Sequence, residues 1–474
     1  MPVRRRKWFV PAAAALLVVG GIAGFAGWQA SQHSCTDAIP DADLPDVTVM
    51  TTPDELDEAI DRQITEQFGQ SLDDQSIITD RITEAYDPAP PFGQPRLTMI
   101  DHPRDTDLAG NGIVLQSHGR NLAVTDSSTG QTTWARDQRG ISYGTLSFGD
   151  RLAMAQVPEN QALTVATVDV TDGEVLACAQ IGEAVENPGY RVRQAAGAAV
   201  GDDSVALIQR QPGDQFGLFM VDVREGEIRW QRTVELDTMP ELVDGAGDAL
   251  VASQVPPGST EAWSFTVDRR DNYPPEMLRL HAFSLADGTP IWDFGLDHDA
   301  GEQHFVHQVI GTTSERVVVR ASRFDESSET IENHVIGLDA TTGEPRWSHQ
   351  LPPSPFDSYS EGRVFGDVVI VAETDDDPDS LYGSLVGYHA STGDQLWQTE
   401  NVTSSLERGA LLDDTAVLPG LSRRGILTID LQSGDTSTAF DGLDVSEIIV
   451  DDTTLGVTFF FHGDPTLILY DRAG

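Results

Sequence analysis

A nine-residue pattern recurs seven times along the chain and limits the folds open to it more than any other feature. In its complete form an apolar segment ends at an aspartate, a glycine follows four residues later, and a tryptophan follows four residues after the glycine. The complete copies are DSSTGQTTW, DVREGEIRW and DATTGEPRW, with Asp126, Gly130, Trp134, Asp222, Gly226, Trp230, Asp339, Gly343 and Trp347. Self-similarity at this scale indicates a repeat architecture.

Four further copies depart from the pattern at one position. Two replace the aspartate by serine or histidine and keep Gly288, Trp292, Gly393 and Trp397. Two keep Asp169, Gly173, Asp430 and Gly434 but have Ala177 and Thr438 where tryptophan is expected. Five of the eight tryptophans of the chain therefore occupy one position of one repeat.

Each copy predicts a β-hairpin. Alternating segments such as LFMVDV are typical of strands, and the glycine after the aspartate supplies the positive φ of a tight turn whose amide groups the aspartate can bind. One or two more apolar segments precede each hairpin, so a period of 41 to 62 residues holds four strands. A four-stranded sheet cannot bury both of its faces alone, which favours sheets stacked radially in a ring.

The hairpin resembles the repeat of the pyrroloquinoline-quinone-like (PQQ-like) β-propellers, a family that includes quinoprotein alcohol dehydrogenases and the outer-membrane assembly lipoprotein. The resemblance covers roughly residues 96–471. It implies that the repeat tryptophans dock each blade on the next, and that the contacts of the second and seventh blades, which have Ala177 and Thr438, are looser.

The number of blades follows from the segments after the last hairpin. SEIIVDD, TLGVTFFF and TLILYD supply three strands of an eighth blade, and we expect 47–50 to supply its fourth. We therefore favour eight blades over seven. The expected organisation is a basic segment with a membrane anchor in 1–35, an acidic linker with a short helix in 36–94, and an all-β propeller in 95–474.

The N-terminal segment predicts a membrane anchor. Arg4, Arg5, Arg6 and Lys7 precede an uncharged run over residues 8–28, which as a helix of about 31 Å would span the hydrocarbon layer. Basic residues stay on the cytoplasmic side, so we expect a single-pass protein of the cell membrane with its propeller on the extracytoplasmic side. A cleaved signal peptide remains the alternative. Cys35 and Cys178 would both lie in this compartment, and the sequence leaves their pairing open.

The charge of the chain restricts its partners. There are 76 acidic and 30 basic residues, a net charge of −46, which repels nucleic acid. A protein or peptide partner should therefore present a basic or mixed surface to one face of the propeller.

The sequence predicts no catalytic residue, cofactor or metal. The family resemblance implies quinone and calcium sites in the dehydrogenases, but this chain has no adjacent cysteine pair and no C-x-x-C-H haem motif, so no catalytic residue is carried over. Two groups have metal-ligand side chains, His298, Asp299, Glu302, His304 and His307, and Glu373, Asp375, Asp376, Asp377 and Asp379. We expect both to be solvated segments, because neither has the ligand spacing of a metal loop.

These observations favour a membrane-anchored extracytoplasmic propeller that acts as a non-catalytic protein-interaction scaffold. The alternatives are a quinone-dependent dehydrogenase with a degenerate site and a ligand sensor of the cell envelope.

Overall fold

The computed structural model describes most of the propeller and short parts of the linker. The described residues are 41–43, 48–50, 54–55, 58, 92–100, 105–109, 113–118, 121–137, 141–157, 162–181, 195–201, 203–211, 215–234, 236, 240–254, 279–295, 303–325, 330–351, 362–374, 383–402, 404–406, 408–420, 425–440, 443–451, 453–461 and 464–472.

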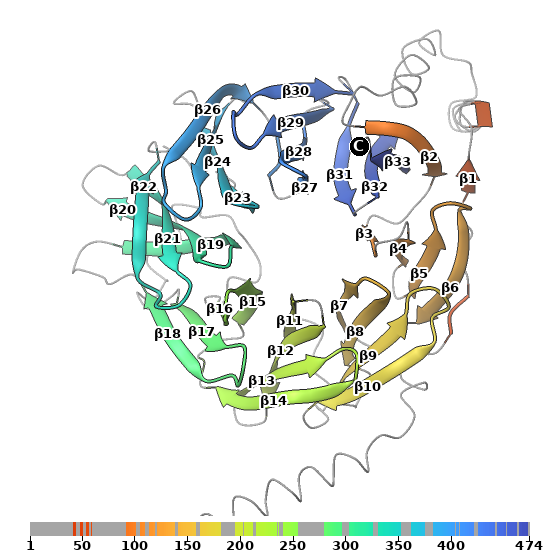
Figure 1. Ribbon diagram of the computed structural model, residues 1–474, viewed down its shortest axis with the longest axis horizontal. Helices are drawn as coiled ribbons and strands as arrows, with labels where there is room; N and C mark the ends of the chain where they lie inside the picture. Colours follow the sequence, from red (N-terminus) through yellow and green to blue (C-terminus); the bar gives the residue numbers. More distant parts are fainter. Residues whose placement is uncertain are drawn as a thin grey trace, which may run out of the picture.

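Eight antiparallel sheets stand around a central axis and form a closed ring (Figure 1). Seven blades are single four-stranded meanders that run outward from the axis in chain order. The prediction of an all-β, eight-bladed propeller is therefore confirmed.

The first four blades follow the chain without interruption. Blade 1 consists of β3 (Asp105–Leu108), β4 (Ile113–His118), β5 (Asn121–Asp126) and β6 (Gln131–Asp137). Blade 2 consists of β7 (Ile141–Phe148), β8 (Arg151–Val157), β9 (Leu163–Asp169) and β10 (Val175–Ile181). Blade 3 consists of β11 (Ala195–Val200), β12 (Ser204–Gln211), β13 (Gln215–Asp222) and β14 (Glu227–Val234). Blade 4 consists of β15 (Pro240–Ala246), β16 (Ala249–Gln254), β17 (Arg279–Ser284) and β18 (Pro290–Gly295).

The next three blades repeat the same order. Blade 5 consists of β19 (Gln303–Thr312), β20 (Arg316–Asp325), β21 (Thr330–Asp339) and β22 (Pro345–Gln350). Blade 6 consists of β23 (Gly362–Phe365), β24 (Val368–Thr374), β25 (Gly383–His389) and β26 (Gln395–Val402). Blade 7 consists of β27 (Ala410–Leu412), β28 (Thr415–Pro419), β29 (Ile426–Asp430) and β30 (Thr436–Ala439).

Blade 8 joins the two ends of the chain and differs from our expectation. Its inner strands are β31 (Val445–Val450), β32 (Thr454–Phe461) and β33 (Asp464–Arg472). The fourth strand is β2 (Phe92–Ile100), which pairs with β33, and not 47–50. Strand β1 (Thr48–Met50) lies outside β2 as a fifth strand. The assignment of 47–50 as the fourth strand was therefore wrong by one place in the sheet.

The described part of the segment before the propeller, residues 41–43 and 48–50, also contacts blade 1. The amide of Ala42 donates to the carbonyl of Ala135 at 3.1 Å, and Asp41 forms an ion pair of 2.7 Å with Arg136. Val49 of β1 packs against the turn of the same blade at Gly130. The chain therefore seals the junction between blades 8 and 1 from outside.

The hydrophobic core lies between the blades. Each of the eight interfaces between neighbouring blades has its own cluster of buried apolar side chains. Along β24, Val368 and Ile370 face blade 7 while Val369 and Val371 face blade 5. Side chains of a strand alternate between its two faces, so a strand with neighbours on both sides is apolar at successive positions.

The linker is described only in part. Asp54, Glu55 and Glu58 are helical, where the sequence predicts a short helix, and the rest of that helix lies outside the described residues. No helix among the described residues is long and apolar enough to cross a membrane. The predicted anchor over 8–28 lies outside them.

Candidate functional site

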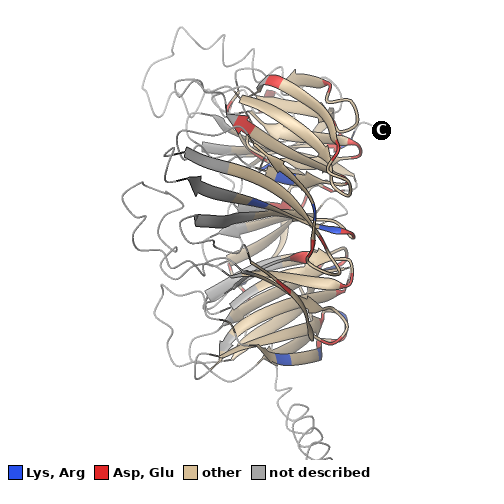
Figure 2. Ribbon diagram, turned by 90° about the vertical axis from the view of Figure 1, so that its left-hand side faces the viewer, with Lys and Arg blue, Asp and Glu red and all other residues tan. Residues whose placement is uncertain are grey.

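The turns that follow the first and the third strands of the blades lie on one face of the ring, which we call the turn face. In an antiparallel meander the turn after the first strand and the turn after the third strand are at the same end of the sheet. Figure 2 shows these short turns along one side of the disc, and Figure 1 is the view onto the turn face.

The repeat motif forms the outer turns of this face. The glycine amide donates to the backbone carbonyl of the first motif residue at 2.7 to 2.9 Å in all seven copies, and the seven glycines have φ values from 64° to 76°. The aspartate side chains cap the turn: Asp169 Oδ1 accepts the amide of Thr171 at 2.8 Å, and Asp430 Oδ1 accepts that of Ser433 at 2.8 Å.

These hydrogen bonds stabilise the charged form of the aspartates. The hydroxyl and then the amide of Thr171 hold the pKa of Asp169 below its usual value. The amide and then the hydroxyl of Ser433 do the same for Asp430. The turns are therefore built for ionised carboxylates.

The repeat tryptophans connect each outer strand to the next blade. The indole NH groups of Trp134, Trp230, Trp292, Trp347 and Trp397 donate at 2.8 to 3.0 Å to the carbonyls of Val170, Leu285, Ala340, Ala390 and Leu431. Each indole ring covers the motif glycine of that blade, where an added Cβ would come within 2.5 to 2.7 Å of the ring. The absence of a side chain at these glycines is what admits the tryptophan.

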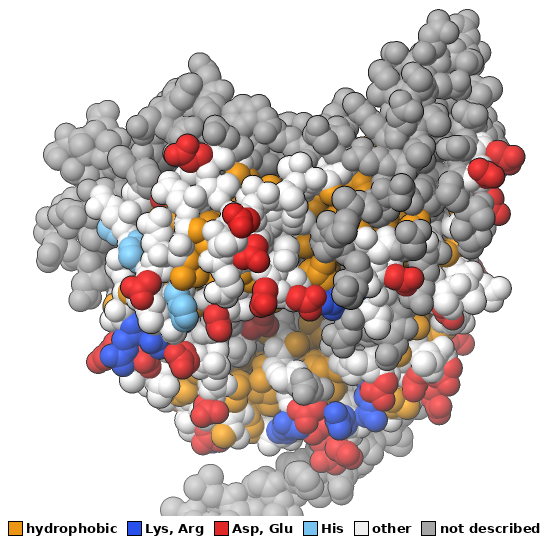
Figure 3. Space-filling model, turned by 45° about the horizontal axis from the view of Figure 1, so that its top comes forward, with side chains coloured by type: hydrophobic (Ala, Val, Ile, Leu, Met, Phe, Trp, Pro, Cys, Tyr) orange, Lys and Arg blue, Asp and Glu red, His pale blue; other side chains and the backbone are white. Residues whose placement is uncertain are grey.

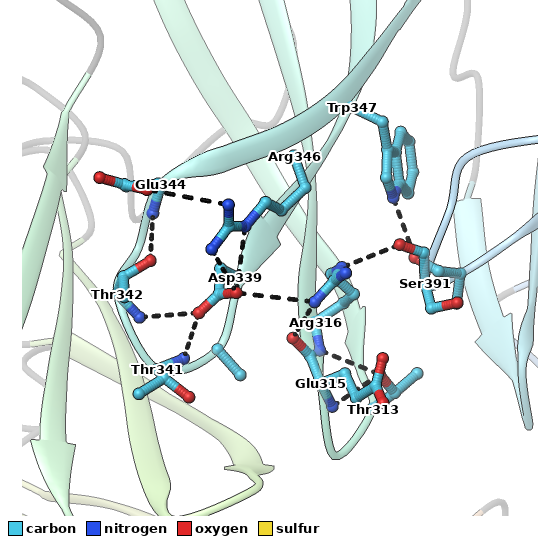
Figure 4. A network of polar contacts seen from close by, with 12 residues as sticks. Thr313, Glu315, Arg316, Asp339, Thr341, Thr342, Glu344, Arg346, Trp347 and Ser391 are labelled. Atoms are coloured by element: carbon cyan, nitrogen blue, oxygen red, sulfur yellow. Dashed lines mark hydrogen bonds and ion pairs between the residues drawn. The ribbon is translucent and has the colours of Figure 1, made fainter.

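Figure 4 shows how the motif of blade 5 and its link to blade 6 share one polar network. Asp339 binds the amides of Thr341 and Thr342 through Oδ1 at 3.0 Å, and Arg346 through Oδ2 at 3.0 Å. Arg316 donates from Nε to the carbonyl of Ser391 in blade 6 at 3.0 Å.

The two copies without tryptophan behave differently from each other. At blade 2 the contact is close and not loose, because a Cβ on Gly226 would come 2.6 Å from the Cβ of Ala177. The smaller side chain lets the two sheets approach until Gly226 touches the backbone of β10. At blade 7 the side chain of Thr438 is exposed, and blade 8 has no motif turn to receive it, since its third and fourth strands come from opposite ends of the chain.

A second set of turns, between the first and second strands of each blade, lies nearer the axis. In six blades an acidic residue lies directly before the second strand. Its backbone carbonyl accepts a hydrogen bond of 2.7 to 3.1 Å from the amide of the residue that follows the first residue of the repeat motif. In blade 8, Thr453 supplies this carbonyl and Asp451 lies in the same turn. We call this set the acidic turn ring: Asp150, Asp203, Asp248, Glu315, Asp367, Asp414 and Asp451.

Few cations balance the ring. Among the described residues, Arg151 approaches Asp150 at 3.7 Å and Arg229 binds Asp203 at 2.8 Å. No ion pair within the described chain engages the side chains of Asp248, Asp367 or Asp414. Figure 3 shows acidic side chains spread over the visible surface, with basic side chains confined to small groups.

A cavity of about 650 Å³ opens on the turn face where blades 3, 4 and 5 meet. Its walls include Asp203, Arg229, Asp244 and Thr313, and its apolar lining includes Met220. Arg229 is held between two carboxylates, Asp203 at 2.8 Å and Asp222 at 2.7 Å.

The two groups of metal-ligand side chains are only partly described. His304 and His307 lie on β19, within the strand, while His298, Asp299 and Glu302 are outside the described residues. Glu373 lies on β24, where burial raises its pKa and the Ser384 hydroxyl donates to it at 3.2 Å. Asp375, Asp376, Asp377 and Asp379 are outside the described residues. No group of three or more metal-ligand side chains occurs within the described residues.

Cys178 on β10 is disulfide-bonded. The chain has one other cysteine, Cys35, which lies outside the described residues. The sequence did not decide whether Cys178 is paired, and the structure shows that it is.

The acidic turn ring was missed in the sequence, although a signal for it exists. A Gly-Asp pair stands directly before the second strand in three blades: Gly149-Asp150, Gly247-Asp248 and Gly366-Asp367. Aligning the repeats one hairpin earlier would have revealed them.

One known protein family matches this chain. The family described as outer membrane protein assembly factor BamB matches residues 103–272 and 276–440, more than half of the chain. No curated protein matches.

Solved structures similar to this chain include BamB from Moraxella catarrhalis, with 12% identity over 77% of this chain and 96% of that chain at a TM-score of 0.42. Quinohemoprotein alcohol dehydrogenase from Comamonas testosteroni has 12% identity over 79% and 75% of the two chains at a TM-score of 0.45. The designed protein Ika8 has 14% identity over 78% and 96% at a TM-score of 0.47.

The family match confirms the resemblance inferred from the tryptophan hairpins. The chain belongs to the BamB-like family of PQQ-type β-propellers.

Proposed function

We propose that this protein is a non-catalytic scaffold, anchored in the cell membrane through residues 8–28, that binds the basic surface of a partner protein on the turn face of its extracytoplasmic propeller. The family described as an outer membrane protein assembly factor supports an assembly role. The disulfide at Cys178 supports an oxidising compartment, because disulfides persist there.

The acidic turn ring is the observation that carries the proposal. At Asp150, Asp248 and Asp367 the turn uses the backbone carbonyl of the ring residue. In blade 8 a threonine, Thr453, supplies this carbonyl. The side chain of Asp203 also binds Arg229, and the side chain of Asp451 accepts the amides of Thr453 and Thr454. The turns at Asp150, Asp248 and Asp367 therefore do not depend on an acidic side chain, and we attribute the recurrence of acidic residues at these positions to what the face contacts.

Electrostatics then determines the kind of partner. The side chain of Asp150 is 79% exposed, and exposed carboxylates on one face sum to a negative potential that attracts positive surfaces and speeds association. This attraction is screened by salt within about 10 Å at 0.1 M ionic strength. We expect partner capture to fall as salt rises.

The test compares two triple variants of the full-length chain that change charge equally. One replaces three ring residues, Asp248→Asn, Asp367→Asn and Asp414→Asn. The other replaces three exposed acidic residues at the start of outer strands, Glu174→Gln, Glu227→Gln and Glu344→Gln. The assay is capture of membrane proteins from the source organism at low and high salt.

We expect the ring variant to lose at least about tenfold in capture, by analogy with charge pairs at interfaces, and the outer-strand variant to keep most of it. Equal capture by the two variants, whether retained or lost, would contradict the acidic turn ring as the binding site. Dye-linked alcohol or sugar oxidation by the chain supplied with quinone and calcium would contradict the non-catalytic role. Protection of the propeller from protease in intact spheroplasts would contradict the topology.

A further inference from the structure

The cavity between blades 3, 4 and 5 has the volume of a ligand site. Its volume of about 650 Å³ is within the range of ligand pockets. Three of its wall residues are glycines, Gly201, Gly245 and Gly247. A Cβ on Gly201 would meet nothing within 4 Å, so the space above this turn is open.

Among the described residues, no cation balances the carboxylate of Asp244 on the cavity wall. Arg229 is bound by Asp203 at 2.8 Å and by Asp222 at 2.7 Å, and its charge is therefore already balanced. No hydrogen bond or ion pair reaches Asp244 from any part of the chain that the structure describes. Asp244 is exposed to solvent on the wall of the cavity, and partial desolvation by its surroundings raises the pKa of its carboxyl.

The backbone places Asp244 in the cavity by a local irregularity. In the pairing of β15 with β16, Leu242 lies opposite Ala252 but Gly245 lies opposite Leu250, so the register shifts between them. A β-bulge of this kind redirects a side chain, and bulges are frequent next to functional sites. Asp244 is one of the two residues that the shift contains.

The remaining lining suits a long cationic side chain. Val200, Met220 and Leu285 give an apolar surface, along which the methylene stem of arginine or lysine packs while its charged end reaches a carboxylate. Thr313 and Ser314 add polar groups at the edge. A guanidinium can bind a carboxylate through two parallel hydrogen bonds, which fixes its orientation.

We propose that this cavity receives an arginine or lysine side chain of the partner protein, with Asp244 as its counter-ion. The inference rests on the proposed function and gives the partner one specific anchor, in addition to the diffuse attraction of the acidic turn ring.

The test measures binding of short peptides to the full-length chain by isothermal titration. The probes are N-acetyl-Gly-Arg-Gly-amide, the same peptide with neutral citrulline in place of arginine, and the free amine agmatine. The variants are Asp244→Asn and, as the matched control, Glu227→Gln, which removes one exposed negative charge outside both the cavity and the acidic turn ring.

We expect the arginine peptide to bind at least about tenfold more tightly than the citrulline peptide, as the loss of a charge-assisted pair implies. Asp244→Asn should remove this preference, and Glu227→Gln should change it by less than about twofold because its carboxylate lies outside the cavity and its charge is screened. Equal losses in the two variants, or none in Asp244→Asn, would overturn the cavity site. Agmatine binding as tightly as the peptide would overturn a protein as the source of the cation.

Partner capture separates this inference from the proposed function. Capture that survives Asp244→Asn but is lost in the ring triple variant overturns the cavity anchor and supports the scaffold. A chain that captures no partner but binds the arginine peptide through Asp244 overturns the scaffold and supports the cavity's preference for a cation.

Discussion

Replacing a motif glycine by alanine should destabilise the ring mainly through the tryptophan of the preceding blade. Gly343 has φ +71°, and a Cβ there would come 2.6 Å from Trp292 Cδ2. Gly149 has φ +69°, and a Cβ there would meet nothing within 4 Å. The two glycines thus share a backbone conformation and differ in what the new methyl group would touch.

The expected magnitudes follow from these two environments. A left-handed conformation costs an alanine about 1–2 kcal/mol, and Gly149→Ala should lose only this amount of unfolding free energy. Gly343→Ala adds the displacement of a packed ring, about 1–3 kcal/mol. It also weakens the hydrogen bond from Trp292 to the Ala340 carbonyl. The difference between the two variants should therefore be about 1–3 kcal/mol.

Urea unfolding followed by tryptophan fluorescence measures both variants. The midpoint reports the stability if the slope of free energy against urea is the same as in the unchanged chain. Equal losses in Gly343→Ala and Gly149→Ala would refute the reasoning, because they would mean that the tryptophan adds nothing to the cost of occupying the turn.

Three more predictions concern the contacts between blades and their ionisation. Ala177→Trp, which restores the repeat consensus, should destabilise the chain by about 1–3 kcal/mol in urea unfolding, since Gly226 leaves no room for the ring; stabilisation would show that blades 2 and 3 can separate freely. Val49→Ala should cost about 1 kcal/mol in the same assay by exposing the turn at Gly130, and no change would mean that β1 does not help to close the ring. The pKa values of Asp169 and Asp430 are lowered in the folded chain, so their contribution to stability is present above the unfolded value of about 3.9 and is lost as pH falls below it. The thermal midpoint should drop between about pH 4 and pH 2, and less steeply in Asp430→Asn; equal slopes would contradict this origin.

The repeats could be predicted from the sequence because each is a local structure. Gly130, Gly226 and Gly343 lie in turns whose hydrogen bonds join residues four apart, so the nine residues themselves specify the conformation. The bulge at Asp244 could not be predicted, since it depends on how β15 is aligned with β16. A shift of one residue in the pairing of β15 with β16 decides whether the carboxylate of Asp244 faces the cavity. The residue pattern of β15 alone does not specify that pairing.

The closing blade shows why the ends of the chain were harder to place than its middle. Seven blades are meanders in which each strand pairs with its sequence neighbour, whereas β2 pairs with β33 from the other end of the chain. Pro95 interrupts the register of β2, and a proline argues against a strand in the sequence. The repeat also predicts a tryptophan of blade 8 over Gly130, but none is available, and Val49 of the linker takes that place. The segment before the propeller thus supplies both the outermost strand and the missing inter-blade contact, and it belongs to the fold although it lies outside the repeat.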